Sequence, residues 1–196
     1  MKHLLLAFLL TFVSIAAQSQ LTKHTWLVGG SGNFYTYHED YTAPSVGFTG
    51  KYSTIDLSPS VGYFLADKFT VGIRSLLSIY KGESSGGAKP NDLKFAAGPF
   101  LRYYFLDIDK PFNLLTDISY QVGINEAKTG DKPKGKFNTF SAMAGTEIFF
   151  NSSVGLEILL GYKNQITSFD NSPSAYTSNK SGFYTSIGFH FHLIKD

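Results

Sequence analysis

The sequence contains no cysteine, and only 16% of its residues are charged, whereas soluble domains average about a quarter. The lack of cysteine excludes a disulfide framework, a thiolate metal site, a catalytic cysteine and a lipid-modified N-terminal cysteine. The formal net charge is +2, so no basic excess recommends a nucleic acid as partner. Aromatic residues also make up 16% of the chain. Something other than water must therefore cover part of the folded surface.

An apolar run of notable length occurs at the N-terminus, from Leu4 to Ala17. Lys2 and His3 precede it, and small residues lie at positions 17 and 19 beside Gln18 and Gln20. A transmembrane helix needs about 20 apolar residues, and this run is shorter. The pattern predicts a secretory signal peptide over residues 1–19, followed by a single domain over residues 20–196.

The rest of the chain consists of strand-like stretches with apolar residues at every second position. This period-two pattern is typical of strands with one apolar face and one small or polar face. Adding a first strand over residues 25–37 and a last over residues 181–193 gives eight strands. The sequence therefore predicts an all-β fold, an eight-stranded antiparallel up-and-down transmembrane β-barrel that follows a signal peptide.

The connections between the predicted strands alternate between long and short. Outer-membrane barrels place short turns in the periplasm and long loops outside, and an even strand number returns both termini to the periplasm. We expect long loops at residues 38–50, 81–91, 125–136 and 164–180, and short turns at 66–68, 106–111 and 151–153.

The short turns fix a register in which apolar residues face apolar residues. A one-residue slip would move every side chain to the opposite face, so agreement between hairpins supports the assignment. Around Asp67 and Ser152 the expected pairs are Leu65 with Phe69, Tyr63 with Val71, Val61 with Ile73, Leu57 with Leu77, Ile55 with Ile79, Ile148 with Leu156, Thr146 with Ile158 and Ala144 with Leu160.

Aromatic residues crowd beside these short turns. Amphipathic rings prefer the headgroup level of a membrane, so the crowding indicates an interfacial girdle on the periplasmic side. The predicted girdle contains Tyr63, Phe64, Phe69, Tyr103, Tyr104, Phe105, Phe112, Phe149 and Phe150.

The second face is rich in glycine and serine, and its strand parity turns five charged residues inward: Arg74, Arg102, Asp117, Glu147 and Glu157. Glu147 and Glu157 face each other and repel in a narrow lumen, so they need an arginine or a shared proton. An eight-stranded barrel is wide enough only for its own side chains. We therefore predict an ion-pair cluster that acts as a polar plug, rather than a catalytic carboxylate pair or an ion path.

No catalytic or metal site is expected. His190 and His192 share the inward parity, but a closed metal site takes about four ligands, and His24 falls on the other face. A lipid deacylase of barrel type would need a nucleophile with a base beside it, and the sequence has no His-x-Ser or Ser-x-His pair. We expect a protein without cofactor and without enzymatic activity.

The last strand carries the most specific pattern. Ser186, Gly188, Phe191 and Leu193 match the C-terminal signal of bacterial outer-membrane barrels, with leucine in place of the commoner aromatic residue and three residues following it. With the signal peptide and the strand pattern, the chain resembles the small outer-membrane β-barrel family of OmpA-, OmpX- and OmpW-like proteins of the Gram-negative cell envelope. The resemblance implies an integral outer-membrane location and recognition of the last strand by the barrel-assembly machinery.

Two functions fit this pattern. The first is a structural or surface-interaction barrel that contacts membrane lipids, with Lys128, Lys132, Lys134 and Lys136 as candidates for contact with lipopolysaccharide phosphates. The second is a small-molecule carrier or narrow channel, either porin-like or a soluble lipocalin-like barrel with its apolar face inward. The glycine- and serine-rich second face favours the membrane barrel, because it would make a poor solvated exterior. A lipid-modifying barrel enzyme is the least favoured alternative.

Overall fold

The computed structural model describes residues 21–43, 46–87, 89–127, 135–169 and 176–193. The predicted signal peptide lies outside these residues. The eight strands are β1 (Trp26–Ala43), β2 (Val46–Ala66), β3 (Phe69–Ser84), β4 (Asn91–Tyr104), β5 (Phe112–Ala127), β6 (Gly135–Phe149), β7 (Val154–Phe169) and β8 (Tyr176–Leu193). None of the described residues forms a helix of the length and apolar character needed to cross a membrane.

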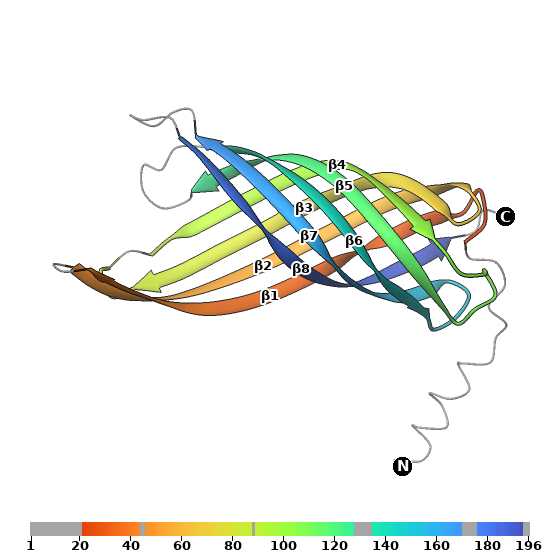
Figure 1. Ribbon diagram of the computed structural model, residues 1–196, viewed down its shortest axis with the longest axis horizontal. Helices are drawn as coiled ribbons and strands as arrows, with labels where there is room; N and C mark the ends of the chain where they lie inside the picture. The colour runs from red at the N-terminus through yellow and green to blue at the C-terminus, as the bar shows by residue number, and fades with distance from the viewer. Residues whose placement is uncertain (1–20, 44–45, 88, 128–134, 170–175, 194–196) are drawn as a thin grey trace, which may run out of the picture.

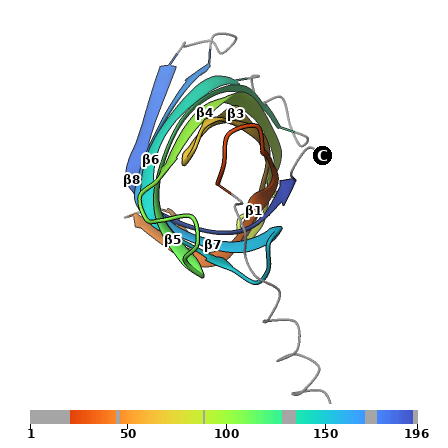
Figure 2. The same cartoon turned by 90° about the vertical axis from the view of Figure 1, so that its right-hand side faces the viewer.

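Each strand pairs antiparallel with the next in the sequence, and β8 pairs with β1, so the sheet closes into a barrel (Figures 1 and 2). The predicted all-β fold with eight strands is confirmed. β1 begins and β8 ends at the same end of the barrel. We call this end, which also carries the connections at 67–68, 105–111 and 150–153, the turn end, and the opposite end the loop end.

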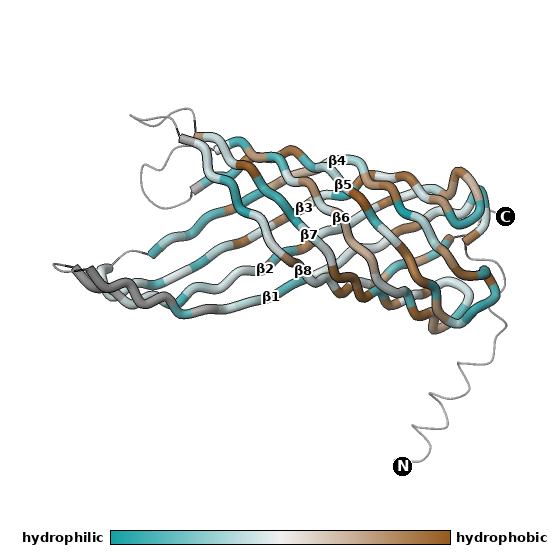
Figure 3. Tube along the Cα trace, in the orientation of Figure 1, coloured by the Kyte–Doolittle hydropathy of each residue, from teal (hydrophilic) through white to brown (hydrophobic). Residues whose placement is uncertain are grey.

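Alternate residues of each strand point to opposite sides of the wall. Large apolar residues are exposed on the outer side, and some of them, among them Ile73, Val122, Leu160 and Phe189, are more than half exposed. Apolar positions concentrate in the half of the barrel nearest the turn end, and the loop-end half is more hydrophilic (Figure 3). A lipocalin-like barrel would bury its apolar face, so the exposed apolar face removes that alternative.

The predicted registers of the short hairpins are confirmed, with one local exception. Tyr63 pairs with Val71 and Glu147 with Glu157, as the alternation required. The expected pair of Leu65 with Phe69 is wrong, because a β-bulge between Phe64 and Ala66 places Ala66 opposite Phe69. A bulge adds one unpaired residue to one strand and increases its twist.

The lengths of the connections differ from the prediction. The expected loop 38–50 is mostly strand, since β1 runs to Ala43 and β2 starts at Val46, and the strands also extend into 81–91, 125–136 and 164–180. The prediction used apolar alternation as the mark of a strand, whereas backbone pairing that has already formed between two strands continues through polar residues.

At the turn end, the connection 105–111 is held by the Asn113 side chain, which accepts from the Leu106 N–H at 2.9 Å and donates to the Leu106 carbonyl at 3.1 Å.

The barrel interior contains an apolar layer that starts at the turn end and reaches the level of the charged residues. Its buried members come from six strands and from the segment before β1: Leu21, Leu27, Phe64, Phe100, Tyr104, Leu115, Met143 and Leu159. Close packing of such side chains removes apolar area from water. Apolar side chains as well as polar groups therefore fill the interior of the barrel.

The segment before β1 folds into the mouth of the barrel, where Figure 2 shows it in red inside the ring of strands. Leu21 is fully buried, and its carbonyl accepts from the Lys68 N–H at 2.7 Å. Lys68 has a φ of 66°, a left-handed conformation that a non-glycine residue rarely adopts. The hydrogen bond to Leu21 fixes the Lys68 amide in this tight turn.

We predict that Leu21→Ala lowers the free energy of unfolding by about 2 kcal/mol. This is the low end of the range for a buried leucine, because the segment before β1 can detach without unfolding of the barrel. The measurement is urea unfolding of the refolded barrel, followed through the fluorescence of the single tryptophan, Trp26. Leu65→Ala is the matched control, because that side chain is half exposed on the outer wall. An equal loss in both variants would show that Leu21 does not anchor the mouth.

Candidate functional site in the barrel interior

A chain of charged side chains crosses the interior among the side chains of the apolar layer, since Phe100 lies loop-ward of Arg102 on β4 and Leu159 lies loop-ward of Glu157 on β7. Both nitrogens of the Arg74 fork donate to the Asp117 carboxylate, at 2.7 and 2.8 Å. Arg102 donates from Nε to the same carboxylate at 3.0 Å. Asp117 is fully buried and so is Arg102. Bidentate contacts of this kind are among the strongest ion pairs, and a buried charge requires them.

Arg102 also joins Asp117 to the first of the two facing glutamates. Its Nη2 lies 2.6 Å from Oε2 of Glu157. Glu157 has a second neighbour in His190, whose Nδ1 lies 3.7 Å away, too far for a hydrogen bond. One guanidinium thus contacts two carboxylates that come from different strands.

The second glutamate, Glu147, is held by different partners. The Tyr104 hydroxyl donates to its Oε2 at 2.6 Å, and His192 Nε2 lies 2.8 Å from its Oε1. Glu147 pairs directly with Glu157 across β6 and β7. Each carboxylate turns to a separate set of partners, and these partners offset the repulsion between the two.

Neighbouring strands bring these groups together through the register. Asp117 pairs with Arg102 across β4 and β5, and Arg74 lies on β3, next to β4. The structure therefore places all five residues expected from the sequence in one cluster. Phe100 lies between the two arginines, with its ring centre 4.7 Å from the Arg74 guanidinium carbon and 5.8 Å from that of Arg102.

Sequence reasoning missed two partners in the cluster, Tyr104 and His192. The predicted interfacial girdle includes Tyr104, Phe64 and Phe149, and the prediction is wrong for all three. Phe64 and Tyr104 are fully buried in the interior, and Phe149 packs against the interior apolar layer and the His192 ring. Each of the three lies two residues from an inward-facing residue on the same strand, namely Arg102, Gly62 and Glu147. This shared parity indicates that their side chains also face inward. Tyr103, Phe105, Phe112 and Phe150 are exposed on the outer wall, as a girdle requires.

Glycine is required at one position beside the cluster. A Cβ atom on Gly155 would lie 2.1 Å from Glu147 Oε1 and 2.7 Å from Glu147 Cγ. The Glu147 side chain therefore occupies the space that any larger residue at position 155 would need.

The described residues contain no group of three or more His, Asp or Glu side chains that could hold a metal ion. Glu147 contacts His192 and Glu157 contacts Arg102, so both carboxylates already have protein partners.

A further motif, Gly82-Glu83-Ser84-Ser85-Gly86, has the G-x-S-x-G spacing of a nucleophile elbow. That motif works at a strand-to-helix turn, whereas here β3 ends at Ser84 and the chain continues into β4 of the same sheet.

The interior opens toward the loop end above the charged cluster. A space of about 40 Å³ remains beside Arg74 and Glu157. Beyond it lies a polar cup of about 370 Å³, lined by residues that include Tyr35, Asp92, Lys94 and Lys180. The free volume therefore falls sharply at the level of the ion pairs.

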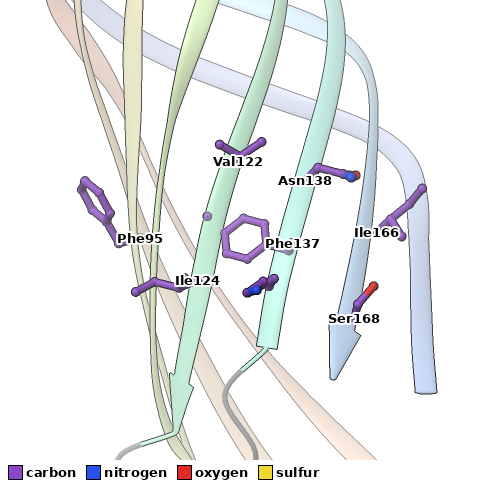
Figure 4. A pocket seen from close by; sticks show the side chains of 9 residues that line it. Phe95, Val122, Ile124, Phe137, Asn138, Ile166 and Ser168 are labelled. Atoms are coloured by element: carbon purple, nitrogen blue, oxygen red, sulfur yellow. The ribbon is translucent and has the colours of Figure 1, made fainter. Parts of the chain in front are cut away.

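The outer wall carries a shallow apolar groove of about 570 Å³ over β4 to β7 (Figure 4). Phe95, Val122, Ile124 and Ile166 surround it, and Phe137 and the side-chain-free Gly123 lie at its base. Its outward position and apolar rim suit contact with hydrocarbon chains rather than with a polar solute.

We predict that Arg102→Ala lowers the free energy of unfolding by about 3–5 kcal/mol, because Asp117 and Glu157 would lose a buried partner. Tryptophan fluorescence during urea unfolding measures the change. Lys68→Ala is the control, since Lys68 pairs with an exposed Asp107 at 3.4 Å and such pairs contribute less than about 1 kcal/mol. If Arg102→Ala and Glu147→Ala both left unfolding unchanged, the cluster would not contribute to stability.

Comparison with known proteins identifies the architecture. No protein-family model matches the chain, and no curated protein sequence matches it. Among solved structures, the outer membrane protein OprG from Pseudomonas aeruginosa is similar, with a TM-score of 0.55 and 14% identity over 90% of this chain and 99% of OprG. Neisserial surface protein A aligns with a TM-score of 0.48 and 13% identity, over 86% of this chain and 97% of the other. The chain thus has the closed eight-stranded fold of the small outer-membrane β-barrels.

Proposed function

We propose that the protein is an integral outer-membrane β-barrel with a structural or surface-interaction role and a plugged lumen. The observation that carries the proposal is the inversion of polarity across the wall. The outer face presents a belt of exposed apolar residues, whereas the interior buries Arg102, Asp117, Glu147 and Glu157. Only a surrounding of hydrocarbon makes that arrangement favourable, because the apolar belt would otherwise face water.

The end at which β1 begins and β8 ends gives the orientation. Outer-membrane barrels keep both termini in the periplasm. The turn end, where β1 begins and β8 ends, is accordingly assigned to the periplasmic side. The more hydrophilic loop-end half in Figure 3 would then project outward from the membrane, with the β1–β2 hairpin reaching farthest (Figure 1). Such a projection suits contact with other molecules at the cell surface.

The interior supports a closed barrel rather than a pore. The apolar layer around Phe64 and Phe100 and the ion pairs of Arg102 occupy the same stretch of the lumen. Opening a path would require separation of buried ion pairs, which is costly. Non-catalytic function is supported by the same contacts, since Tyr104 and His192 occupy Glu147 and Arg102 occupies Glu157.

The proposed partners follow from the location. Membrane lipids would contact the outer belt, including the groove beside Val122 and Ile124, and Lys136 is exposed where lipopolysaccharide phosphates would lie. The other lysines of that predicted loop fall outside the described residues. Phe191 and Leu193 of the C-terminal signal both face outward on β8, where the barrel-assembly machinery could contact them during insertion.

The first test is the electrophoretic mobility of the protein in the outer-membrane fraction of expressing cells, with and without boiling. A folded membrane barrel is compact until it is boiled, so we expect a mobility shift on boiling. A protein found in the soluble periplasmic fraction without a shift would overturn the membrane assignment.

The same preparation then tests the plug in planar bilayers. We expect no steady conductance above that of the protein-free bilayer, and a known porin inserted under the same conditions serves as positive control. Steady conductance steps from protein that shows the mobility shift would favour the narrow-channel alternative and leave the membrane location intact.

A further inference from the structure

The wall of the barrel is not paired along its whole length at the closing seam. The register between β1 and β8 runs from Trp26–Leu193 to Gly32–Ile187 and stops there. Both strands continue well beyond that point, β1 to Ala43 and β8 back to Tyr176. By contrast, β1 and β2 pair over the full length of β1. The loop-end half of the seam is therefore open at the side.

The opening begins at the upper edge of the apolar belt. Phe34 on β1 pairs with Ile55 in the belt, and the next outward residue, Thr36, pairs with Ser53. On the other side of the seam, Phe183 is 87% exposed. Aromatic residues at such a boundary sit at the level of lipid headgroups. A molecule in the outer leaflet would thus meet the opening with its headgroup at the right height.

A cavity of about 450 Å³ lies at the opening and enters the interior between Phe34 and Phe183. Small-molecule sites span about 300–1,000 Å³, so this volume is sufficient for a ligand. The cavity shares Tyr35, Lys94 and Lys180 with the polar cup. It is therefore continuous with the cup at the loop end.

Three lysines line this cavity against a single carboxylate. Lys94, Lys163 and Lys180 face Asp56, and the adjoining cup adds Asp92, so the site remains positive overall. Within the described part of the chain, none of the three lysines makes an ion pair. Lys163 lies over the Tyr184 ring, 4.7 Å from its centre. Cationic side chains with spare donors complement a carboxylate or a phosphate.

The floor of the cavity is closed. The Asn33 amide donates to the Tyr184 hydroxyl from β1 to β8, just above the last paired residues of the seam. Below this bridge lie the ion pairs of Arg74 and Arg102. A molecule that enters from the side would be retained above the plug.

We propose that the open seam is a lateral binding site for a single-chain amphiphile with an anionic headgroup. The headgroup binds Lys94, Lys163 and Lys180 inside the wall, and the hydrocarbon chain passes between Phe34 and Phe183 into the outer leaflet. A free anion would satisfy the lysines but would leave the aromatic rim without an apolar partner. The proposal rests on the outer-membrane location proposed above and adds a ligand to it.

The test uses the full barrel in phospholipid nanodiscs and a photoreactive fatty acid that carries a diazirine on its chain. Mass spectrometry of the crosslinked protein maps the sites of attachment. We expect labelling on β1 and β8 at the seam, and about tenfold weaker labelling in Lys94→Gln/Lys163→Gln, the equivalent of one lost charge-assisted hydrogen bond. Lys81→Gln on the outer surface should not change it. An uncharged fatty alcohol with the same chain should label the wild type about as weakly as the double variant.

A second variant blocks the cavity and leaves the lysines in place. A Cβ added to Gly182 would meet nothing within 4 Å, so Gly182→Phe fills the opening without a clash at the backbone. We expect it to abolish labelling at the seam, whereas Thr36→Phe, on the outer face of β1, should not.

Each outcome is decisive when combined with the boiling-dependent mobility shift. Equal labelling of wild type, Gly182→Phe and the double lysine variant, all with a normal shift, would overturn the lateral site and leave the membrane location standing. Equal labelling by the acid and the alcohol would overturn the headgroup assignment in the same way. Loss of the shift in the wild type itself would overturn both proposals.

Discussion

Closure of the sheet by β8 on β1 is the constraint on which the rest of this structure depends. Backbone groups in hydrocarbon have no water to bond, so a strand edge cannot remain open there. In the outer-membrane location proposed above, the β1–β8 ladder from Trp26–Leu193 to Gly32–Ile187 would meet that requirement along the apolar belt. Beyond the ladder the seam is open, and there water would have to satisfy the backbone groups.

Closure also determines the chemistry of the interior. Alternation sends every second side chain into a lumen that is too narrow for bulk water. Nearest the turn end, Phe64 and Tyr104 fill it, and Arg102 bridges Asp117 and Glu157 beside Phe100. The arrangement gives these buried charges partners of opposite sign on the turn-end side of the polar cup.

Much of this organisation could be predicted because side-chain parity is a strict property of a strand. The pairs Tyr63–Val71 and Glu147–Glu157 follow from turn positions and alternation alone. The bulge before Ala66 and the strand extensions through polar residues could not be predicted in this way, since neither produces an apolar pattern in the sequence. Tyr104 and Phe64 were misplaced because their aromatic character was weighed above their parity.

The sequence by itself determined the strand number, the two faces and the five charged residues of the interior cluster, because these depend on local alternation and on turns. Only the tertiary structure decided which charges pair, since Arg102, Glu157 and His190 come from β4, β7 and β8 and meet through barrel curvature. It also decided where the seam ends and which lysines face it. Contacts across the lumen depend on the relative height of distant strands, which no local pattern records.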